Sequence, residues 1–320
     1  MQSIGILGIG LLGRGIAACL LANGYQVTVY STNTAEYQQA EISISFALNE
    51  LSTRGLLAHN RALNWRENIV WASELGPLRA CSFVIESILE SLSAKIALYE
   101  RLADIIGPHT PIATNTSSLP IGQLQAGCKH PNRLIGMHWA EPAHATRFLE
   151  VVCGPQTSAS TLEATLQLAA TLGKEPCVVH TALPGFIANR LGYALYREAL
   201  HLLQLGVADA ETIDCAFRNS IGLWAASCGP LRWIDLTGGP ALYLRAMDNV
   251  LPGLSNASST SELACDSVNG EDKGILNGSG FYNYSAAQAA EWQERFQKHV
   301  WTIRALQEEE FPIACSSSGI

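Results

Sequence analysis

The sequence carries little charge and has no excess of basic residues. Charged side chains make up 15% of its 320 residues, and 28 acidic residues against 20 Lys and Arg give a formal net charge of −8. Phosphate recognition needs clustered Lys and Arg, so this balance argues against a nucleic-acid partner. No apolar run reaches the roughly 18 residues of a membrane-spanning helix. The opening segment MQSIGILGIG lacks a basic region and a cleavage site, so we expect neither a secretory signal nor a membrane partner.

The cysteines lack the spacing of a metal or redox site. Their number is odd and no two form a C-x-x-C pair, so we expect no zinc ribbon, no thioredoxin-like motif and no bound metal. The nine positions are Cys19, Cys81, Cys128, Cys153, Cys177, Cys215, Cys228, Cys265 and Cys315. Most stand among apolar neighbours and are interpreted as small core residues. This pattern favours free thiols in a reducing cytoplasm.

The length and composition favour a folded protein of two domains. Hydrophobic residues make up 48% of the chain, enough for a large core, and the length exceeds one ordinary domain. Short apolar runs alternate with amphipathic stretches in the first half, which predicts a Rossmann-type, doubly wound, mainly parallel sheet with helices on both faces. The predicted strands span residues 4–7, 27–30, 81–85, 111–113, 134–137, 148–152 and 177–179. The predicted helices among them span residues 13–22, 34–54 and 93–106.

The second half has the pattern of an all-α domain. Residues 186–205, 209–220 and 286–309 are predicted to be helical, and no strand pattern follows residue 179. We place the boundary at the turn Leu183-Pro184-Gly185, which gives domains of residues 1–183 and 184–320. Residues 252–280 are rich in Ser, Asn and Gly and are predicted to be irregular.

A glycine motif follows the first predicted strand. The segment Gly8-Ile9-Gly10-Leu11-Leu12-Gly13 is a G-x-G-x-x-G that also opens a helix, the context in which this pattern binds dinucleotides. Gly8 permits the tight turn, Gly10 lets the backbone approach a pyrophosphate, and Gly13 lets helix and strand pack closely. The helix start offers free N–H groups to the phosphates. A glycine-rich turn without a ligand is the alternative interpretation.

The residue after the second predicted strand bears on the choice of cofactor. An acid at this position of an NAD site binds the ribose hydroxyls, whereas this chain has Ser31 followed by Thr32-Asn33. Loss of the carboxylate removes the repulsion of a 2′-phosphate, yet no Arg follows to hold one. We expect NAD with weak discrimination, so NADP stays possible. On this view Ser31→Asp sharpens the preference for NAD.

A histidine and an acid downstream could form a proton-transfer pair. His138 follows an apolar strand at the expected carboxyl edge of the sheet, where α/β enzymes bind ligands. Glu150 stands alone among the apolar residues of 148–152, and a buried carboxylate needs a cationic or donor partner. A histidine suits this role, because the carboxylate fixes its tautomer and stabilises the imidazolium. Two alternatives stay open: His138 as an ordinary buried residue, and Glu150 exposed or paired with Arg147.

Several ordered blocks resemble the 3-hydroxyacyl-CoA dehydrogenase family over nearly the whole chain. Besides the glycine motif, the main blocks are Asn115-Thr116-Ser117-Ser118-Leu119, Gly136-Met137-His138-Trp139-Ala140-Glu141-Pro142 and Pro184-Gly185-Phe186-Ile187-Ala188-Asn189-Arg190. Smaller ones are Ile85-Glu86-Ser87, Gly206-Val207-Ala208, Gly229-Pro230 and Gly280-Phe281-Tyr282. The resemblance implies an NAD-dependent oxidoreductase that acts on 3-hydroxyacyl thioesters of fatty acid metabolism.

The resemblance also implies roles for individual residues. His138 is the implied general acid/base, which takes the hydroxyl proton while hydride passes to the nicotinamide, and Glu150 orients it. Ser117 and Asn189 match positions that hydrogen-bond the substrate oxygen and the histidine region. Loop capping by Ser117 and a helix-start hydrogen bond by Asn189 are the alternatives. The implied cofactor-binding residues are Gly8, Gly10, Leu11, Leu12, Gly13, Ser31, Glu90, Lys95, Asn115 and Ser117.

The chain departs from the family pattern on the substrate side. The family has Asn three residues after the histidine, where this chain has Glu141, and it presents lysines for the coenzyme A tail between the second and third strands. Residues 34–74 contain no Lys and only three Arg. The leading interpretation is nevertheless a dehydrogenase of 3-hydroxyacyl thioesters, on coenzyme A or a carrier protein.

Two further interpretations stay open. One is a dehydrogenase of a free 3-hydroxy acid, with the same catalytic residues, like the family's L-gulonate 3-dehydrogenase (similar to lambda-crystallin) and L-carnitine dehydrogenase. The other is a non-catalytic, crystallin-like nucleotide-binding protein, which has no need of a His138–Glu150 pair. In each case we expect a homodimer through the C-terminal helical domain. Residues 186–205 are more apolar than one small domain can hide, and family members pair through this region.

Overall fold

A computed structural model describes residues 2–259 and 272–313 of the chain. These residues form two compact units. The first runs up to Asn189 and also includes Ile313, and the second spans Arg190–Pro312. The division after Asn189 lies a few residues beyond the boundary predicted at residue 183.

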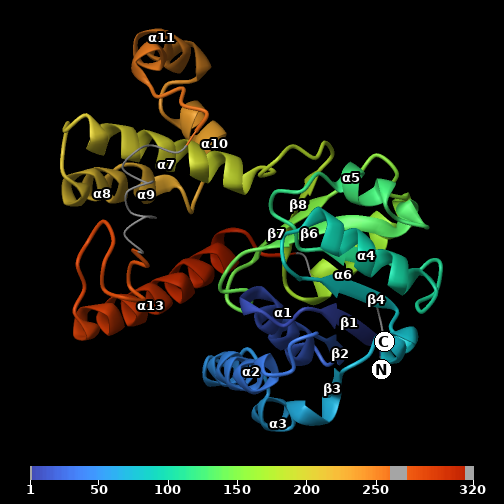
Figure 1. The fold of residues 1–320 in the computed structure, drawn as a ribbon. Helices are drawn as coiled ribbons and strands as arrows, with labels where there is room; N and C mark the ends of the chain where they lie inside the picture. Colours follow the sequence, from blue (N-terminus) through green and yellow to red (C-terminus); the bar gives the residue numbers. More distant parts are fainter. Residues whose placement is uncertain (1, 260–271, 314–320) are drawn as a thin grey trace. The chain divides into compact units, whose positions relative to one another are not determined.

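The first unit is built on one eight-stranded sheet (Figure 1). The strand order is β3-β2-β1-β4-β5-β6-β7-β8, and every neighbouring pair is parallel except β6 and β7. The strands are β1 (Ser3–Leu7), β2 (Gln26–Tyr30), β3 (Ile69–Ala72), β4 (Phe83–Glu86), β5 (Ile112–Thr114), β6 (Leu134–Trp139), β7 (Phe148–Val152) and β8 (Glu175–Val179). This architecture confirms the predicted doubly wound, mainly parallel fold. The edge strand β3 is the one strand that the sequence pattern did not predict.

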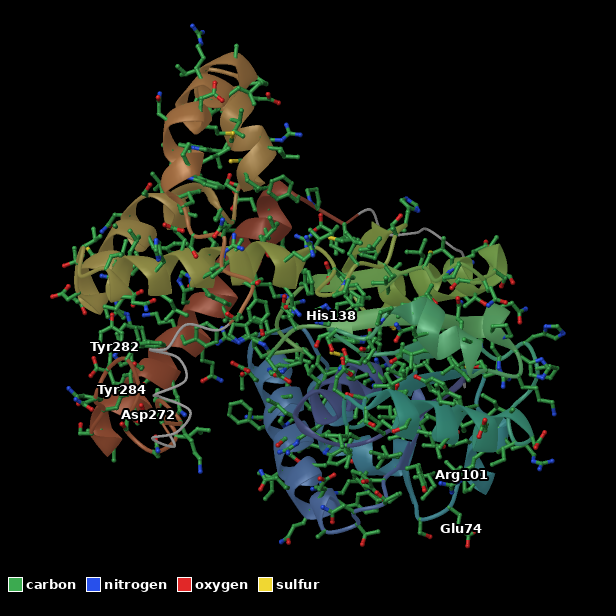
Figure 2. The ribbon with its side chains drawn as sticks, turned by 45° about the horizontal axis from the view of Figure 1, so that its top comes forward. Glu74, Arg101, His138, Asp272, Tyr282 and Tyr284 are labelled. Atoms are coloured by element: carbon green, nitrogen blue, oxygen red, sulfur yellow. The ribbon has the colours of Figure 1, made fainter. Side chains whose placement is uncertain are left out.

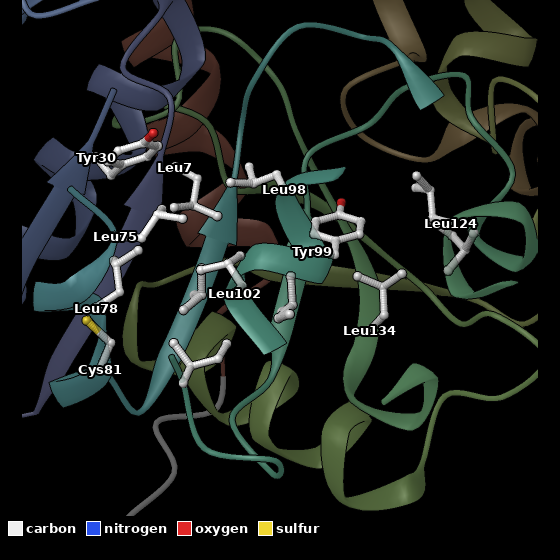
Figure 3. Packing of buried hydrophobic residues seen from close by; sticks show 14 of the residues in the cluster. Leu7, Tyr30, Leu75, Leu78, Cys81, Leu98, Tyr99, Leu102, Leu124 and Leu134 are labelled. Carbon is white, nitrogen blue, oxygen red and sulfur yellow. The ribbon is translucent and has the colours of Figure 1, made fainter. Parts of the chain in front are cut away.

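Helices connect the strands and cover the sheet. They are α1 (Leu11–Ala22), α2 (Glu36–Thr53), α3 (His59–Leu63), α4 (Leu92–Ala103), α5 (Ile121–Ala126) and α6 (Ala159–Thr171). One buried cluster joins α4 and α5 to the strands beneath them, and its members include Leu7, Leu98, Leu102 and Leu134 (Figure 3). The central strands are apolar on both faces because both faces are covered, as a parallel sheet requires.

The sheet places its functional residues along one edge. In β1, β4, β5 and β6 the chain runs in the same direction, so the segments that follow these strands all leave at the carboxyl edge. The segments after β1, β4 and β5 begin with Gly8, Ser87 and Asn115, and β6 ends just after His138. Ligands of open α/β sheets bind along this edge.

The second unit consists of helices. They are α7 (Ala188–Gln204), which begins at the division, α8 (Ala210–Asn219), α9 (Ile221–Trp224), α10 (Gly229–Leu236), α11 (Pro240–Val250) and α13 (Ala286–Glu310). The long helix α13 starts with a capping box between Ser285 and Gln288. Of the predicted irregular segment 252–280, residues 260–271 lie outside the described residues, and the rest forms the end of a 3-10 helix (Leu251–Gly253), short turns and isolated bridges. Within the described residues, no helix has the length and apolarity needed to cross a membrane.

Candidate active site

His138 and Glu150 lie side by side on two adjacent strands. They occupy directly paired positions of the antiparallel strands β6 and β7, and the His138 Nδ1 is 2.7 Å from the Glu150 Oε2. His138 is labelled in Figure 2. Both side chains are almost fully buried, with 9% and 1% of their surfaces exposed. The structure thus brings together the two residues that the sequence predicted as a pair.

The second oxygen of Glu150 binds the backbone at the start of α7. Its Oε1 accepts hydrogen bonds from the N–H groups of Ile187 and Ala188, each at 2.9 Å. Burial raises the pKa of Glu150, but the hydrogen bonds from His138, Ala188 and Ile187 outweigh it and hold the pKa below its ordinary value. Glu150 is therefore an ionised acceptor, and the His138 Nδ1 is the donor.

The alternative partner for Glu150 is engaged elsewhere. Arg147 forms an ion pair with Glu175 at 2.9 Å, so it does not provide the counter-charge of Glu150. Two aromatic rings flank the imidazole of His138 instead, Phe148 at 6.0 Å and Phe186 at 5.7 Å between ring centroids. These rings restrict the orientation of the imidazole without competing for its Nε2.

The loop that carries Ser117 is organised around one carboxylate. The Glu90 Oε1 accepts hydrogen bonds from Thr116 Oγ1 at 2.5 Å, Ser117 N at 3.1 Å and Ser118 N at 3.0 Å. Burial raises the pKa of Glu90, but these hydrogen bonds and the charge of Lys95 outweigh it and lower the pKa overall. The Ser117 hydroxyl itself makes no hydrogen bond to the residues that the structure describes, so it is available to a ligand.

Asn115 connects the loop of Ser117 to β6, the strand that carries His138, through hydrogen bonds. Its side-chain amide donates to Ser87 Oγ at 3.1 Å, and its carbonyl accepts from the backbone N–H of Trp139 at 2.9 Å. Asn115 thus joins the ends of β4, β5 and β6 directly beside His138. Asn189 lies in the first turn of α7, next to the N–H groups that bind Glu150, and its side chain makes no hydrogen bond to the described part of the chain.

Lys95, one of the predicted cofactor-binding residues, is buried beside two carboxylates. Its side chain is 1% exposed, and its Nζ lies 2.6 Å from Glu86 Oε1 and 3.5 Å from Glu90 Oε2. Tyr99 and Thr114 donate to the other oxygen of Glu86, at 2.6 and 2.8 Å. Lys95 was predicted to contact the cofactor, and this role stays a prediction; within the protein its ammonium lies between these carboxylates. We interpret it as a group that fixes Glu90, and through Glu90 the loop of Ser117.

Glu86 was not predicted from the sequence as a site residue, although a usable signal was present. Glu86 is an acid at the end of the apolar strand β4 and is fully buried. A single acid in an apolar strand is the same pattern that singled out Glu150. The partners of Glu86 could not be found from the sequence, because Tyr99 and Thr114 come from other elements.

The glycine motif has the geometry that NAD requires. A Cβ on Gly10 would meet no atom within 4 Å, so the backbone is open to a phosphate, whereas a Cβ on Gly13 would collide with the Gly8 carbonyl. Gly8 has φ +88°, a value that favours glycine. Gly10 caps α1 without a side-chain hydrogen bond, which leaves the helix N–H groups for phosphate oxygens. Of the predicted neighbours, Leu11 is exposed and Leu12 half-buried.

The loop after β6 packs over the first turns of α1. The Glu141 carboxylate lies 3.7 Å from the point where a Cβ would stand on Gly15. Its side chain reaches solvent, yet burial of the carboxyl raises the pKa of Glu141, against the N–H of Ala143 and the charges of Arg14 and Lys174. The next polar residue of the loop, His144, bonds Glu50 of α2 at 2.8 Å. The loop therefore brings an acid beside the start of α1.

This arrangement can transfer a proton beside a redox cofactor. NAD, when bound, supplies the group that accepts or returns a hydride. With Nδ1 donating to Glu150, the Nε2 of His138 is the atom that can take a proton from a substrate hydroxyl or give it back to a carbonyl. Glu150 stabilises the positive charge that then develops on the imidazole. The free hydroxyl of Ser117 can donate to the substrate oxygen. Fold and site together define an NAD-dependent dehydrogenase.

Comparison with known proteins gives the family. Residues 3–182 match the NAD-binding domain of 3-hydroxyacyl-CoA dehydrogenase, and residues 185–284 match its C-terminal domain. The chain belongs to the 3-hydroxyacyl-CoA dehydrogenase family, as the resemblance of its motifs predicted. NAD is therefore the cofactor, and the intact His138–Glu150 pair argues against a non-catalytic, crystallin-like protein.

Curated relatives differ in substrate. The chain is 31% identical over 312 residues to a 5-formyl-3-hydroxy-2-methylpyridine 4-carboxylate 5-dehydrogenase of Mesorhizobium japonicum, which covers 97% of this chain and 100% of the relative. It is 35% identical over 238 residues to a 3-hydroxyadipyl-CoA dehydrogenase of Escherichia coli, covering 74% of this chain and 49% of that protein. A probable 3-hydroxybutyryl-CoA dehydrogenase of Bacillus subtilis is 30% identical over 285 residues, 89% of this chain and 98% of the relative.

The solved structures that resemble this chain also differ in the substrates that their names describe. A crystal structure of the pyridine-carboxylate 5-dehydrogenase, an NAD+-dependent dismutase by its own description, superposes with TM-score 0.87 at 30% identity, over 98% of this chain and 99% of the other. The (S)-3-hydroxybutyryl-CoA dehydrogenase of Ralstonia eutropha superposes with TM-score 0.73 at 28% identity, over 89% and 99%.

Proposed function

We propose that the protein uses NAD to interconvert a hydroxyl and a carbonyl group on a small carboxylic acid that carries no coenzyme A. The observation that carries this proposal is that the arginine side chains between β2 and β3 already bind other groups of the protein. Arg54 pairs with Glu50 at 3.5 Å, Arg61 donates to the Ala22 carbonyl at 3.0 Å, and Arg66 pairs with Glu41 at 3.3 Å. Residues 34–74 contain no Lys, so this surface offers no uncommitted cation to a phosphate-rich tail.

The comparisons support the same substrate class. The pyridine-carboxylate dehydrogenase aligns with this chain from end to end and superposes with the higher TM-score, 0.87 against 0.73. The name of that enzyme describes a small acid without a thioester. This similarity over the whole chain supports a free acid as the class of substrate. The individual compound is a matter for experiment.

A 3-hydroxyacyl-CoA thioester, the leading interpretation from the sequence, is the second candidate. The similarity to the 3-hydroxyadipyl-CoA dehydrogenase, 35% identical over 238 residues, favours it. The chain spans about half of that relative's length. Both candidates use His138 as general acid/base, Glu150 to orient it, and Ser117 and Asn189 at the substrate oxygen. They differ only in what binds the rest of the substrate.

A substrate panel followed by NADH absorbance tests the proposal. The panel contains free 3-hydroxybutyrate, gulonate, carnitine and pyridine carboxylates carrying a hydroxymethyl or formyl group, and 3-hydroxybutyryl-CoA as the thioester. We expect kcat/KM for at least one free acid to exceed that for the thioester, and His138→Gln to lower both activities by the same large factor. A thioester preference of tenfold or more contradicts the proposal.

We further propose that the protein is a homodimer. The helices α7 to α11 contain no buried residue, although α7 carries apolar side chains such as Leu191, Tyr193 and Tyr196, which are 53%, 67% and 61% exposed. So much apolar surface on a helical unit needs a cover, and a second copy of the same unit provides a self-complementary one.

A reducing compartment is part of this proposal. The seven cysteines in the described residues are all free thiols. Burial raises the pKa of Cys81 and brings that of Cys128 to about 11, so these thiols stay protonated and unreactive. This supports the cytoplasmic setting expected from the sequence.

A further inference from the structure

The turn after β2 lies against the glycine motif. The backbone N–H of Gly8 donates to the carbonyl of Tyr30 at 2.8 Å, and Leu7 pairs with Tyr30 in the sheet. Ser31 is the next residue, so it stands where the carboxylate of an NAD site normally binds the ribose hydroxyls. Ser31 is buried and cannot supply that charge.

A carboxylate reaches this position from the neighbouring helix. Glu36, in the first turn of α2, has its Oε2 3.5 Å from the Ser31 Oγ. The Ser31 hydroxyl also accepts the N–H of Asn33 at 3.1 Å, which leaves its proton for Glu36. Glu36 is half-buried, and among the described residues no cation pairs with its carboxylate.

A tyrosine holds the turn that presents this carboxylate. The Tyr37 hydroxyl accepts the N–H of Ser31 at 3.3 Å and donates to the Ala72 carbonyl of β3 at 2.9 Å. Its ring lies 4.7 Å from that of Trp71, between centroids. Because Tyr37 follows Glu36 directly, these contacts fix the start of α2 relative to the ends of β2 and β3.

We infer that Glu36 is the residue that selects NAD over NADP. Its carboxylate accepts hydrogen bonds from the adenosine ribose hydroxyls, a role that an acid at the position of Ser31 would otherwise have. The same carboxylate repels the phosphate that NADP carries on the 2′-hydroxyl of this ribose. The inference concerns the cofactor and holds whatever substrate the enzyme takes.

The charges around the turn agree with this role. Residues 31–40 contain no Lys or Arg, so nothing in this stretch attracts a phosphate. The guanidinium of Arg14 is engaged with the Gly10 carbonyl at 3.3 Å and with Ser43 Oγ at 3.2 Å. The start of α2 would by itself favour an anion, and the negative charge of Glu36 cancels that preference.

Binding of cofactor fragments tests the inference without any substrate. Calorimetric titration compares ADP-ribose with its 2′-phosphorylated analogue on the wild-type protein and on Glu36→Gln. We expect the wild type to bind ADP-ribose more tightly. In Glu36→Gln the ratio of the two dissociation constants should shift on the order of tenfold toward the phosphorylated fragment, the size expected for loss of a charge-assisted hydrogen bond. Thermal unfolding of the variant establishes that it is folded.

A matched variant on the same helix serves as the control. Glu41 pairs with Arg66 at 3.3 Å instead of Ser31, so Glu41→Gln removes one negative charge from α2 without touching the turn. We expect the ratio of dissociation constants to stay at its wild-type value. An equal shift in both variants would mean that only the net charge of the helix matters, and would overturn the inference.

Moving the acid gives a second, independent test. With Glu36 in place, Ser31→Asp sets two carboxylates against each other, so we expect it to weaken ADP-ribose binding rather than sharpen the NAD preference that the sequence alone predicted. The double variant Ser31→Asp/Glu36→Gln should restore binding, since it returns one acid to the turn. If Ser31→Asp alone sharpens the preference and Glu36→Gln leaves it unchanged, Glu36 has no part in selection.

Discussion

The Glu150 carboxylate and the His138 imidazole are joined by the sheet itself, since the two residues form a directly paired position of β6 and β7. This strand pair is also the antiparallel pair of the sheet. The distance between the two side chains is therefore fixed by a backbone ladder, while the second oxygen of Glu150 fixes the start of α7. One buried carboxylate thus sets both the tautomer of the histidine and the entry into the next helix.

Replacement of His138 tests the proton transfer. His138→Gln removes the atom that exchanges the proton, so we expect turnover to fall about 10²- to 10⁴-fold. Binding of NADH, followed by its fluorescence, should change little because the glycine motif is untouched. Turnover near the wild-type rate would exclude His138 from the mechanism.

Glu150 should make stability depend on pH in a defined direction. Its pKa is lower in the folded protein than the value of about 4.3 in an unfolded chain, so the folded state holds fewer protons on this group. The stabilisation is present above about pH 4.3 and is lost as the pH falls through the folded pKa. The difference in unfolding free energy between wild type and Glu150→Gln, from urea titrations, should therefore shrink on acidification. Glu163→Gln, at an exposed position of α6, should show no such trend.

Much of the fold could be predicted because its signals are local. The apolar runs of the central strands and the glycines of the first turn are visible in the sequence, and these elements are confirmed within a few residues. Strand β3 was missed because Ile69–Ala72 is a four-residue edge strand of consecutive apolar residues, directly after a 3-10 helical turn. Such a segment carries little apolar periodicity.

The candidate site could be predicted only where family motifs or an isolated acid marked it. A family motif marked His138, and Glu150 is the isolated acid of an apolar strand. The cofactor role of Lys95 came from the resemblance alone, and the structure encloses its ammonium between two carboxylates. Glu36 was missed because nothing in the sequence shows that α2 begins where its first turn can reach Ser31. Contacts between side chains of different elements depend on packing, which no local pattern encodes.

Lys95 should contribute strongly to stability. Lys95→Met leaves the buried carboxylate of Glu86 without its cation, and breaking a buried ion pair on one side costs about 3–5 kcal/mol. We expect a marked fall in the urea midpoint. Lys129→Met is the matched control, because Lys129 pairs with Asp104 at an exposed site and such pairs contribute little. Equal midpoints for the two variants would show that the Lys95 pair is not stabilising.

The close packing at the glycine motif should make Gly13 intolerant of any side chain. In Gly13→Ala the added Cβ would overlap the Gly8 carbonyl, so α1 must move away from β1. We expect NADH binding to weaken at least tenfold, because the helix N–H groups leave their phosphate positions. Gly76→Ala, where a Cβ meets open space, should bind NADH as the wild type does.

The exposed face of α7 provides the test of the dimer. Sedimentation at micromolar concentration should give the mass of two chains, twice 34.4 kDa. Tyr193 and Tyr196 lie with their ring centroids 5.7 Å apart on this face, and the double substitution by Lys places two charges there. Uncompensated charge in an apolar interface is costly, so the variant should sediment as a monomer while its sheet unit still binds NADH. A wild-type protein that sediments as one chain would contradict the proposal, because the apolar helices would then be stable without a cover.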